Sequence, residues 1–452
     1  MPKIFHGIFL LFIHYCVFSQ SYSIDTLITG LPKPVAFSFM DSDKLLITLK
    51  DSTVRVYNQN GSFIKTFWNF RDSLYFSGQE SGVLGVCTDP GFNSNHYVYV
   101  YYTHLSPPSI RVIRFTENNN TGTSPVIILN ILQAQSGIHY GGNMHFGADD
   151  KLYVSVGTGS NNNDAQLLNS PRGKILRINR DGTIPVNNPF YDDGNPLTGS
   201  DDRIWARGLR NTFDFCFSPF NDSLYSTENG SSVDELNFIR KGKNYGWPVC
   251  QGYCSPYIDS LKQPMFALNA YVPTGIIIYN GTQFPTLSGK VIFGSYSFQS
   301  LYTATLNSSL DSIEYITPWA ATGRPVSVSQ GTDGNIYVLN YGFTNEGTFI
   351  RVKPYITSIG NNNYIINFSL SQNYPNPFNP VTNIKYEIPV SSFVTVKIYN
   401  SLGVQISTIV NENKKQGSYD VNWDGTNFPS GVYFYELSAG EFTERKKMVL
   451  VK

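Results

Sequence analysis

Stretches in which apolar and polar residues alternate recur along most of the chain, separated by turns rich in Gly, Asn, Asp and Ser. Six of these stretches share one pattern, a polar turn followed by β-branched and aromatic residues, and they begin at Ser42, Ser94, Asp149, Asn221, Ser288 and Asp333. Alternation with a period of two predicts half-buried β-strands. Apolar segments precede and follow these stretches, so each repeat predicts a sheet of at least three strands.

The six starts are 52, 55, 72, 67 and 45 residues apart, and repeats of this length are typical of β-propeller blades. One such sheet cannot bury both of its faces, whereas six sheets around an axis cover one another and protect their edges. We therefore expect an all-β fold with a six-bladed β-propeller over residues 24–354. Two stacked sandwiches are the alternative. The early segment "SIDTLITGL", from Ser23, is predicted to pair with the last repeat and close the ring.

The pattern changes after Pro354. Residues 355–369 have the composition of a linker, and residues 370–452 consist of short predicted strands divided by turns. This last segment resembles the type A C-terminal sorting domain of the type IX secretion system, through "NYPNPFNPVTNIKYEIP" and "GSYDVNWDGTNFPSGVYFYEL". The resemblance implies a small β-sandwich that the type IX secretion machinery recognises, and which serves as an address for export rather than as a catalyst.

The first 20 residues pair Lys3 with an apolar run of about a dozen residues. This predicts a secretory signal peptide, because a membrane span needs roughly twenty apolar residues. A lipid attached to Cys16 is the alternative, although its neighbours suit lipidation poorly. No later segment is apolar enough to span a membrane. We therefore expect export via the periplasm and a secreted or cell-surface protein, in which Cys250 and Cys254 could close a small loop.

The 33 basic and 33 acidic residues balance, and charged residues make up only 15% of the chain. No net field attracts nucleic acid or an anionic membrane, so both are excluded as partners. The six histidines and five cysteines make no paired spacing of the kind that binds zinc, and no nucleophile-elbow motif supports a Ser-His-Asp hydrolase. Cys87 and Cys216 lie in apolar strand segments and are predicted to be buried thiols.

Five motifs follow one another in the predicted propeller: "ESGVLGVCTDPGF" from Glu80, "HYGGNMHFGADDKLYVSVG" from His139, "GKILRINRDGTIPVNNPF" from Gly173, "IWARGLRNTFDFCFSP" from Ile204 and "DELNFIRKGKNYGWP" from Asp234. Through them the propeller segment resembles the soluble glucose/sorbosone dehydrogenase family, whose propellers bind pyrroloquinoline quinone (PQQ). The resemblance implies an exported quinoprotein that oxidises an aldose sugar at its anomeric carbon by hydride transfer to PQQ. The alternative is a propeller of the same family that has lost PQQ and binds carbohydrate or protein.

The resemblance assigns His139 as the general base that removes the hydroxyl proton, and a neutral imidazole near pH 7 suits this task. Gly141 and Gly142 beside it would let a flat cofactor approach the backbone closely. Arg210 and Asn211, in "GLRN", match positions that face the quinone oxygen, where negative charge develops. Without the resemblance, a polar residue that caps the edge of a blade is the better interpretation of His139.

The chain has few basic residues at the positions where the family resemblance implies them. PQQ carries three carboxylates, and burying them without cations leaves unpaired charge. Of the basic residues expected near the last two blades only Arg324 remains, assigned to a PQQ carboxylate, while Ser297 and Thr322 occupy the other positions. Glu80 matches a position near the substrate and cofactor, although an inter-blade hydrogen bond suits it equally. PQQ binding is therefore the point at which the two hypotheses differ.

The same resemblance implies two calcium positions. Backbone carbonyls of Gly230 and Ser231 would hold the ion that acts as a Lewis acid on the quinone. Glu235 and Tyr245 match a separate structural calcium position and offer the oxygen ligands that calcium prefers, although Glu235 could equally be a surface charge. The sequence identifies neither the sugar nor the electron acceptor, because specificity depends on long loops.

Overall fold

The computed structural model describes residues 22–78, 80–132, 137–355, 368–440 and 442–452. The chain divides into two compact units, Met1–Ile356 and Thr357–Lys452. Both consist mainly of β-strands and loops, and the helices among the described residues are single short turns: α1 (Phe92–Asn95), η1 (Asn162–Gln166) and η2 (Pro285–Leu287). The predicted signal peptide (1–20) and most of the predicted linker (355–369) lie outside the described residues.

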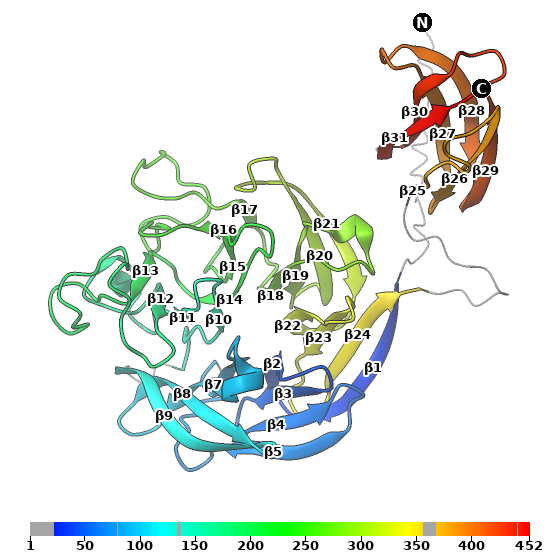
Figure 1. The fold of residues 1–452 in the computed structure, drawn as a ribbon. Helices are drawn as coiled ribbons and strands as arrows, with labels where there is room; N and C mark the ends of the chain where they lie inside the picture. Colours follow the sequence, from blue (N-terminus) through cyan, green and yellow to red (C-terminus); the bar gives the residue numbers. More distant parts are fainter. Residues whose placement is uncertain (1–21, 79, 133–136, 356–367, 441) are drawn as a thin grey trace, which may run out of the picture. The chain divides into compact units, whose positions relative to one another are not determined.

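The described part of the first unit contains six antiparallel sheets of four strands, labelled in Figure 1. In chain order, the first five consist of β2–β5 (Pro34–Phe39, Lys44–Leu49, Thr53–Asn58, Phe63–Asn69), β6–β9 (Val83–Thr88, Tyr97–His104, Ser109–Asn118, Thr121–Leu132), β10–β13 (Met144–Phe146, Leu152–Val156, Lys174–Ile178, Ile204–Arg207), β14–β17 (Thr212–Phe217, Leu224–Glu228, Asp234–Ile239, Phe266–Leu268) and β18–β21 (Pro273–Ile278, Val291–Ser295, Ser300–Leu306, Ile313–Ala321). The sixth combines β22–β24 (Pro325–Gln330, Ile336–Asn340, Gly347–Pro354) with the N-terminal β1 (Tyr22–Leu31). Sheets of four strands fit propeller blades.

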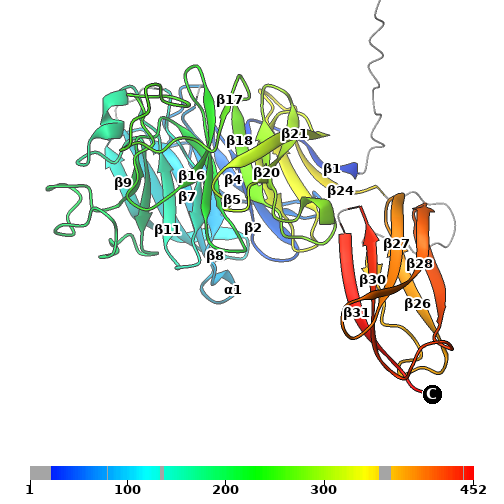
Figure 2. The same ribbon diagram turned by 90° about the horizontal axis from the view of Figure 1, so that it is seen from above.

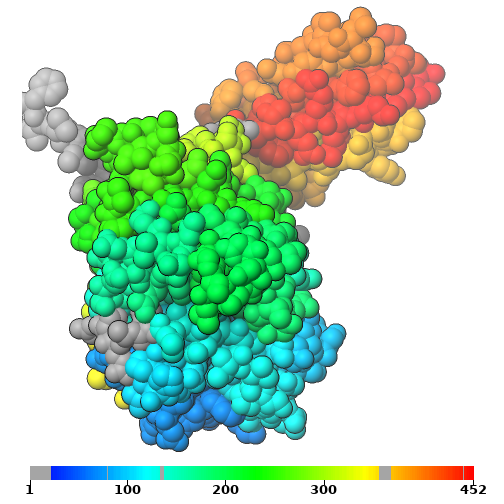
Figure 3. Space-filling model, turned by 90° about the vertical axis from the view of Figure 1, so that its left-hand side faces the viewer, coloured from blue at the N-terminus to red at the C-terminus, as the bar shows by residue number. Residues whose placement is uncertain are grey.

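The six sheets follow one another around a common centre. The first strand of each sheet contacts the first strand of the next, and β22 returns to contact β2. The first strands therefore lie innermost (Figure 1), and Figure 2 shows the same sheets edge-on. Seen from one side, the colours run in chain order from blue through cyan to green (Figure 3). β1 pairs with β24, from Tyr22 opposite Pro354 to Leu31 opposite Gly347, which confirms that the N-terminal segment completes the last sheet.

The six repeats read from the sequence correspond to the second strands of the six sheets: β3, β7, β11, β15, β19 and β23. Every residue of β11 and of β23 is buried, because each sheet is covered by neighbours on both faces. Buried clusters accordingly combine side chains of adjacent sheets, such as Tyr101, Val154 and Leu176. The fourth strands are not predicted by the pattern, because an outer strand such as β5 is mostly exposed or half-buried.

The second unit is described by itself from residue 368 onward. It contains a three-stranded sheet of β25 (Ser369–Leu370), β26 (Val381–Ile388) and β29 (Gly417–Asp424), and a four-stranded sheet of β28 (Gln405–Lys414), β27 (Ser392–Tyr399), β30 (Gly431–Ala439) and β31 (Phe442–Leu450). In β26 every second residue is buried, as expected for a sheet with one buried face. Side chains from both sheets form one buried cluster, including Ile384, Val396 and Tyr435.

Candidate functional site

A cavity of about 560 Å³ is lined by residues from all six sheets. Some lining residues lie at the starts of first strands or in the loops before them, such as Val35 and His139. Others directly follow second strands, such as Tyr341. In an antiparallel hairpin these two positions lie at the same edge of the sheet, so the cavity lies at one end of the ring axis. Its volume is ordinary for a small-molecule site.

His139 lines this cavity from the loop before β10 and is buried. Its Nδ1 lies 3.1 Å from the carbonyl oxygen of Gly159, and a carbonyl only accepts, so Nδ1 carries the proton and Nε2 keeps its lone pair. Burial, with a smaller effect of the Arg210 guanidinium, lowers the pKa of the imidazole. The ring is therefore neutral near pH 7, and none of the described residues forms a hydrogen bond with Nε2.

Glu80 holds the backbone of this loop. Its Oε2 accepts hydrogen bonds from the backbone amide of His139 at 2.6 Å and from the side-chain amide of Asn211 at 3.2 Å. The Oδ1 of Asn211 in turn accepts from the backbone amide of Gly141 at 3.0 Å. These loops belong to three consecutive sheets, and together they hold His139 in a left-handed conformation, with φ 54°. The inter-sheet hydrogen bond that the sequence offered as an alternative for Glu80 is therefore present.

Arg210 lines the cavity from the loop before β14. Its Nη1 donates to the carbonyl oxygen of Asn229 at 2.7 Å, and its guanidinium lies 5.4 Å from the centre of the Trp247 ring. A guanidinium over an aromatic face is held in place by a cation–π interaction. The other N–H groups of the Arg210 guanidinium form no hydrogen bond with any described residue and could bind a ligand.

Glu228, at the end of β15, supports Arg210 and Asn211 from behind. Its carboxylate accepts hydrogen bonds from the backbone amide of Arg210 at 2.9 Å, from the backbone amide of Asn211, and from the hydroxyl of Thr212 at 2.6 Å. Burial raises the pKa of this carboxyl group to about 7. Glu228 anchors both predicted residues, a role for which the sequence carried no motif.

Gly141 and Gly142 line the cavity, with left-handed φ angles of 69° and 130°. A Cβ atom on Gly141 would lie 2.6 Å from the carbonyl oxygen of Ser155, and one on Gly142 would lie 2.7 Å from the Cβ of Leu84. The local packing therefore requires glycine at both positions. The close approach of a flat ligand to these two residues stays a prediction.

The segment after β15 brings oxygen atoms to the cavity. Asn229, Gly230 and Asp234 line it, and the Oδ1 of Asn229 is buried with no hydrogen-bond partner in the described part of the chain. The Asp234 carboxylate accepts hydrogen bonds from the amides of Gly230 at 3.0 Å and Val272 at 2.9 Å. An unpaired oxygen near a buried carboxylate fits a hard cation such as calcium. Ser231, the other predicted ligand, is exposed and lies outside the lining.

Glu235 and Tyr245 lie outside the cavity lining. Glu235 is 6% exposed, which shows that the surface-charge alternative is wrong. Its carboxylate accepts hydrogen bonds from the amide of Gly252 at 2.6 Å and from the side chain of Asn237 at 3.0 Å. The Tyr245 hydroxyl instead donates to the carbonyl oxygen of Phe238 at 2.6 Å. The two side chains thus have separate protein partners, and their shared calcium site stays a prediction.

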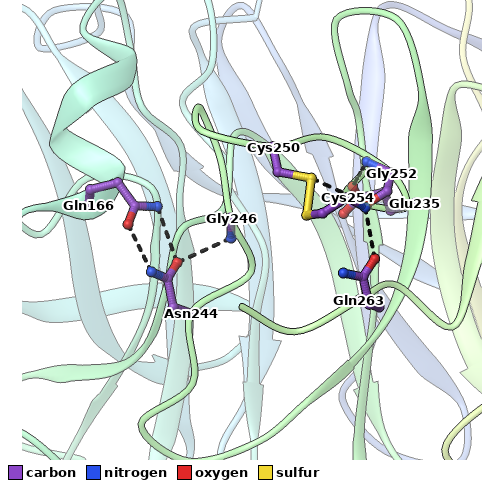
Figure 4. The surroundings of a disulfide bond; sticks show 8 residues. All are labelled: Gln166, Glu235, Asn244, Gly246, Cys250, Gly252, Cys254 and Gln263. Carbon is purple, nitrogen blue, oxygen red and sulfur yellow. Dashed lines mark hydrogen bonds between the residues drawn. A yellow bond between two sulfur atoms is a disulfide. The ribbon is translucent and has the colours of Figure 1, made fainter. Parts of the chain in front are cut away.

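A small loop next to Glu235 is closed by a disulfide between Cys250 and Cys254, as the sequence suggested (Figure 4). The backbone of this loop supplies one of the hydrogen bonds to the Glu235 carboxylate, so the disulfide helps to hold that buried acid. Of the two other described cysteines, Cys87 is buried as predicted, whereas Cys216 is half-buried.

Arg324 is exposed and lies outside the cavity lining. Its guanidinium lies 5.5 Å from the centre of the Phe343 ring and 6.0 Å from that of Tyr296, and both of these rings line the cavity. The structure thus places Arg324 next to an aromatic wall of the cavity. Ser297 is exposed, and the Thr322 hydroxyl is buried without a partner among the residues described.

Sequence reasoning missed one cation of the cavity, Lys50, which directly follows β3 and is buried. Asn229, Tyr296 and Tyr341 also line the cavity, and each is likewise the first residue after the second strand of its sheet. Aligning the six repeats at the ends of these strands reveals all four positions. The repeats in the sequence therefore contained the information needed to find these four residues.

The charged side chains among the described lining residues balance, with Lys50 and Arg210 set against Glu80 and Asp234. Both carboxylates already accept hydrogen bonds from backbone amides, so they do not neutralise the two cations by direct contact. The two cations, the aromatic walls and the Nε2 of His139 are groups that a planar aromatic carboxylate could contact.

Two family models match the chain. The model of Glucose / Sorbosone dehydrogenase matches residues 31–351, and the model of a Secretion system C-terminal sorting domain matches residues 372–452. A sorting tail of this kind indicates export and the cell surface. None of the helices in the described segments is long and apolar enough to cross a membrane.

The relatives agree with the first model. The aldose sugar dehydrogenase YliI of Escherichia coli is 25% identical, over 74% of this chain and 93% of its own. The quinoprotein glucose dehydrogenase B of Acinetobacter calcoaceticus is 29% identical, over 52% of this chain and 54% of its own. The solved structure of a putative oxidoreductase (glucose dehydrogenase) from Thermus thermophilus has a TM-score of 0.66 at 26% identity, covering 73% of this chain and 99% of that chain. Because the first model spans well over half of its length, the chain belongs to the Glucose / Sorbosone dehydrogenase family.

Proposed function

We propose that this protein is an exported quinoprotein that oxidises an aldose sugar at its anomeric carbon, with PQQ as the hydride acceptor. The observation that carries the proposal is the state of His139, a residue of the cavity lining. A carbonyl holds its Nδ1 proton, while its Nε2 is unprotonated and has no partner among the described residues. Removal of the proton from a sugar hydroxyl requires a base of this kind. Membership of a family of sugar dehydrogenases supports the same reaction.

When bound, PQQ supplies the electrophilic carbonyl that takes up the hydride. The Nε2 of His139 accepts the proton of the anomeric hydroxyl, and burial keeps the imidazole neutral for that task. The guanidinium of Arg210, which lines the same cavity, would supply positive charge to the quinone when it is bound. Each end of the Asn211 amide makes one hydrogen bond to a neighbouring loop, to Gly141 and to Glu80. We therefore assign Asn211 to holding the His139 loop rather than to contact with the reacting atoms.

We further propose that calcium binds where the segment after β15 offers oxygen atoms. The buried Oδ1 of Asn229 supports this assignment, and the carbonyls of Gly230 and Ser231 complete the ligand set that the family resemblance implies. A divalent cation there would offset the nearby carboxylate of Asp234 and add positive charge to a cavity that must hold an anion.

We infer that the six sheets are the blades of one closed propeller over residues 24–354, and that residues 370–452 form a small sandwich. The closed cycle of contacts between first strands supports the first inference, and the single cluster shared by two sheets supports the second. A signal peptide at residues 1–20 and passage through the periplasm complete the route of export in this proposal.

The test is to mix the purified full chain with PQQ and calcium, and to follow the quinone absorbance and the reduction of a dye with a panel of aldoses. The dye stands in for the electron acceptor. Dye reduction that saturates with a sugar supports the proposal. Sugar or protein binding without PQQ binding would favour the non-catalytic alternative, which Ser297 and Thr322 motivate. A chain that neither binds PQQ nor reduces the dye refutes the oxidoreductase proposal.

A further inference from the structure

Lys50 has an environment that the fold itself does not explain. The residue is 8% exposed and lines the cavity, and its ammonium forms no hydrogen bond or ion pair with any residue that the structure describes. The ammonium lies 6.0 Å from the centre of the Tyr341 ring, at the outer limit of a cation–π interaction. Burial lowers the pKa of this ammonium to about 8. A buried charge without a partner is costly, and proteins rarely retain one without a use for it.

A second buried lysine of the same unit shows how this fold satisfies an ammonium internally. Lys174, on β12, is fully buried. Its ammonium donates to the carbonyl oxygens of Asp164 at 2.8 Å, Ala165 at 3.1 Å and Arg172 at 2.7 Å. An ammonium has three donors, so Lys174 uses all of them within the protein. The donors of Lys50 are left for a molecule that enters the cavity.

The charged groups around Lys50 do not act as its internal partners. Asp51, the next residue in the chain, accepts a hydrogen bond from the ammonium of Lys33 at 3.0 Å. Glu80 accepts from two amides of the neighbouring loops. Glu80 and Asp51 favour the charged form of Lys50 and Lys33 opposes it, all three without direct contact. The cavity wall thus presents an ammonium whose nearest carboxylates are already engaged.

Building on the function proposed above, we infer that Lys50 binds a carboxylate group of the molecule held in the cavity. One ammonium matches one carboxylate in charge, and a charge-assisted hydrogen bond between them is short and strong. Lys50 also adds a cation to a cavity in which Ser297 and Thr322 occupy positions where the family resemblance implies basic residues. It comes from the first sheet, which contacts the sixth through β2 and β22.

The aromatic side chains near Lys50 narrow the class of ligand. The Tyr341 ring lies 6.3 Å from the ring of Tyr296 and 5.2 Å from that of Phe343, measured between centroids, and all three rings line the cavity. A planar aromatic carboxylate can contact this wall and Lys50 together. Two sources offer a carboxylate, the quinone cofactor and a sugar acid, and the aromatic wall favours the quinone.

The test compares the full chain with three variants. Lys50→Met removes the charge and keeps the length of the side chain, Lys50→Arg keeps the charge, and Lys33→Met removes a neighbouring charge outside the cavity lining. Isothermal titration calorimetry at pH 7 measures the binding of PQQ and of benzene-1,3,5-tricarboxylate, an aromatic polycarboxylate without redox chemistry. A second pair of titrations compares glucuronate with glucose, using protein saturated with PQQ where PQQ binds.

We expect Lys50→Met to weaken the binding of both polycarboxylates by about 10- to 100-fold, the size of a charge-assisted hydrogen bond. Lys50→Arg and Lys33→Met should bind them within about fivefold of the unaltered protein, since the first keeps the charge and the second removes a half-buried ion pair outside the cavity lining. A loss confined to glucuronate would assign the carboxylate to the sugar instead of the quinone.

The remaining outcomes separate this inference from the proposed function. If Lys50→Met binds PQQ, the tricarboxylate and glucuronate as tightly as the unaltered protein does, the inference is wrong and the proposed function stands. If the unaltered protein binds the tricarboxylate through Lys50 but does not bind PQQ, the inference stands and the proposed function is wrong. If it binds none of the three anions, both are wrong.

Discussion

Replacing Lys50 by methionine should make the ligand-free protein more stable at neutral pH. Burial is the largest cause that lowers the ammonium pKa from 10.5 to about 8, and no hydrogen bond to a described residue offsets it. This difference corresponds to about 3 kcal/mol, since each factor of ten in proton affinity equals about 1.4 kcal/mol. Methionine has a similar length and no charge. The free energy of unfolding of the first unit should therefore rise by about 2–3 kcal/mol at pH 7.

This gain in the free energy of unfolding should decrease as the pH rises. The pKa of Lys50 in the folded protein lies below its value of 10.5 in the unfolded chain, so folding releases protons between the two values. The cost is fully present below about pH 8 and disappears as the pH rises toward 10.5, where the unfolded chain also loses the charge. At pH 10 the two proteins should differ by less than about 1 kcal/mol.

Differential scanning calorimetry of the full chain measures the effect. For a unit of about 330 residues the unfolding entropy is about 0.7 kcal/mol per kelvin, so a gain of about 3 kcal/mol raises the midpoint of the first unit by about 4 °C at pH 7. Lys33→Met is the control, because the Lys33 side chain is 30% exposed and paired with Asp51. It should shift the midpoint by less than about 2 °C. A Lys50→Met protein that melts at or below the unaltered midpoint at pH 7 would refute the reasoning.

Lys174→Met should have the opposite effect in the same assay, lowering the midpoint, because three buried carbonyl oxygens lose their donor; an unchanged or higher midpoint would contradict this. His139→Ala should abolish sugar-dependent dye reduction and change the affinity for PQQ by less than about tenfold; loss of both together would argue against its role as the base. Glu228→Ala should destabilise the first unit by about 3 kcal/mol, because two amides and a hydroxyl lose their acceptor; equal midpoints in calorimetry would show that water replaces the carboxylate.

Most of the strand order could be predicted from the sequence, because burial determines where apolar residues recur along the chain. The second strands are covered on both faces, so apolar residues are dense in them, as in β7. Placement of β1 followed from the need to pair the exposed edge of the last sheet. The fourth strands could not be predicted in the same way. β5 has a single buried residue, and β17 has only three residues, too few to show a period.

The candidate site could be predicted only where a motif marks it. His139, Arg210 and Asn211 lie in distinctive motifs, and the structure brings all three to one cavity. Lys50 lies in no such motif. Its place in the cavity depends on how the six sheets assemble, which brings the residues after four of the six second strands to a common space. Arg324, expected at a carboxylate, lies outside the lining because aromatic rings occupy that part of the wall.

Three groups of the cavity residues have unused bonding capacity within the described part of the protein: the ammonium of Lys50, the Nε2 of His139 and the Oδ1 of Asn229. They come from three sheets. The ammonium requires a hydrogen-bond acceptor, the Nε2 requires a donor, and the Oδ1 requires a donor or a cation. Of the three, the Oδ1 of Asn229 is itself a buried atom, and a buried unpaired group of this kind costs about 1–3 kcal/mol. An uncharged sugar could offer Lys50 a hydroxyl acceptor but no opposite charge, whereas a carboxylated quinone with calcium and a sugar would satisfy all three groups under the proposed function.

The cost at Lys50 also connects the stability of the protein with its affinity for a ligand. A carboxylate that binds the ammonium restores the interactions that burial removed, so binding recovers up to the same free energy that the ligand-free protein lacks. About 3 kcal/mol corresponds to roughly 100-fold in affinity, the upper end of the effect expected for Lys50→Met. The increase in melting temperature and the loss of polycarboxylate binding are therefore two effects expected of the same ammonium. A variant that shows the first without the second would mean that the ammonium faces the cavity but does not contact the ligand.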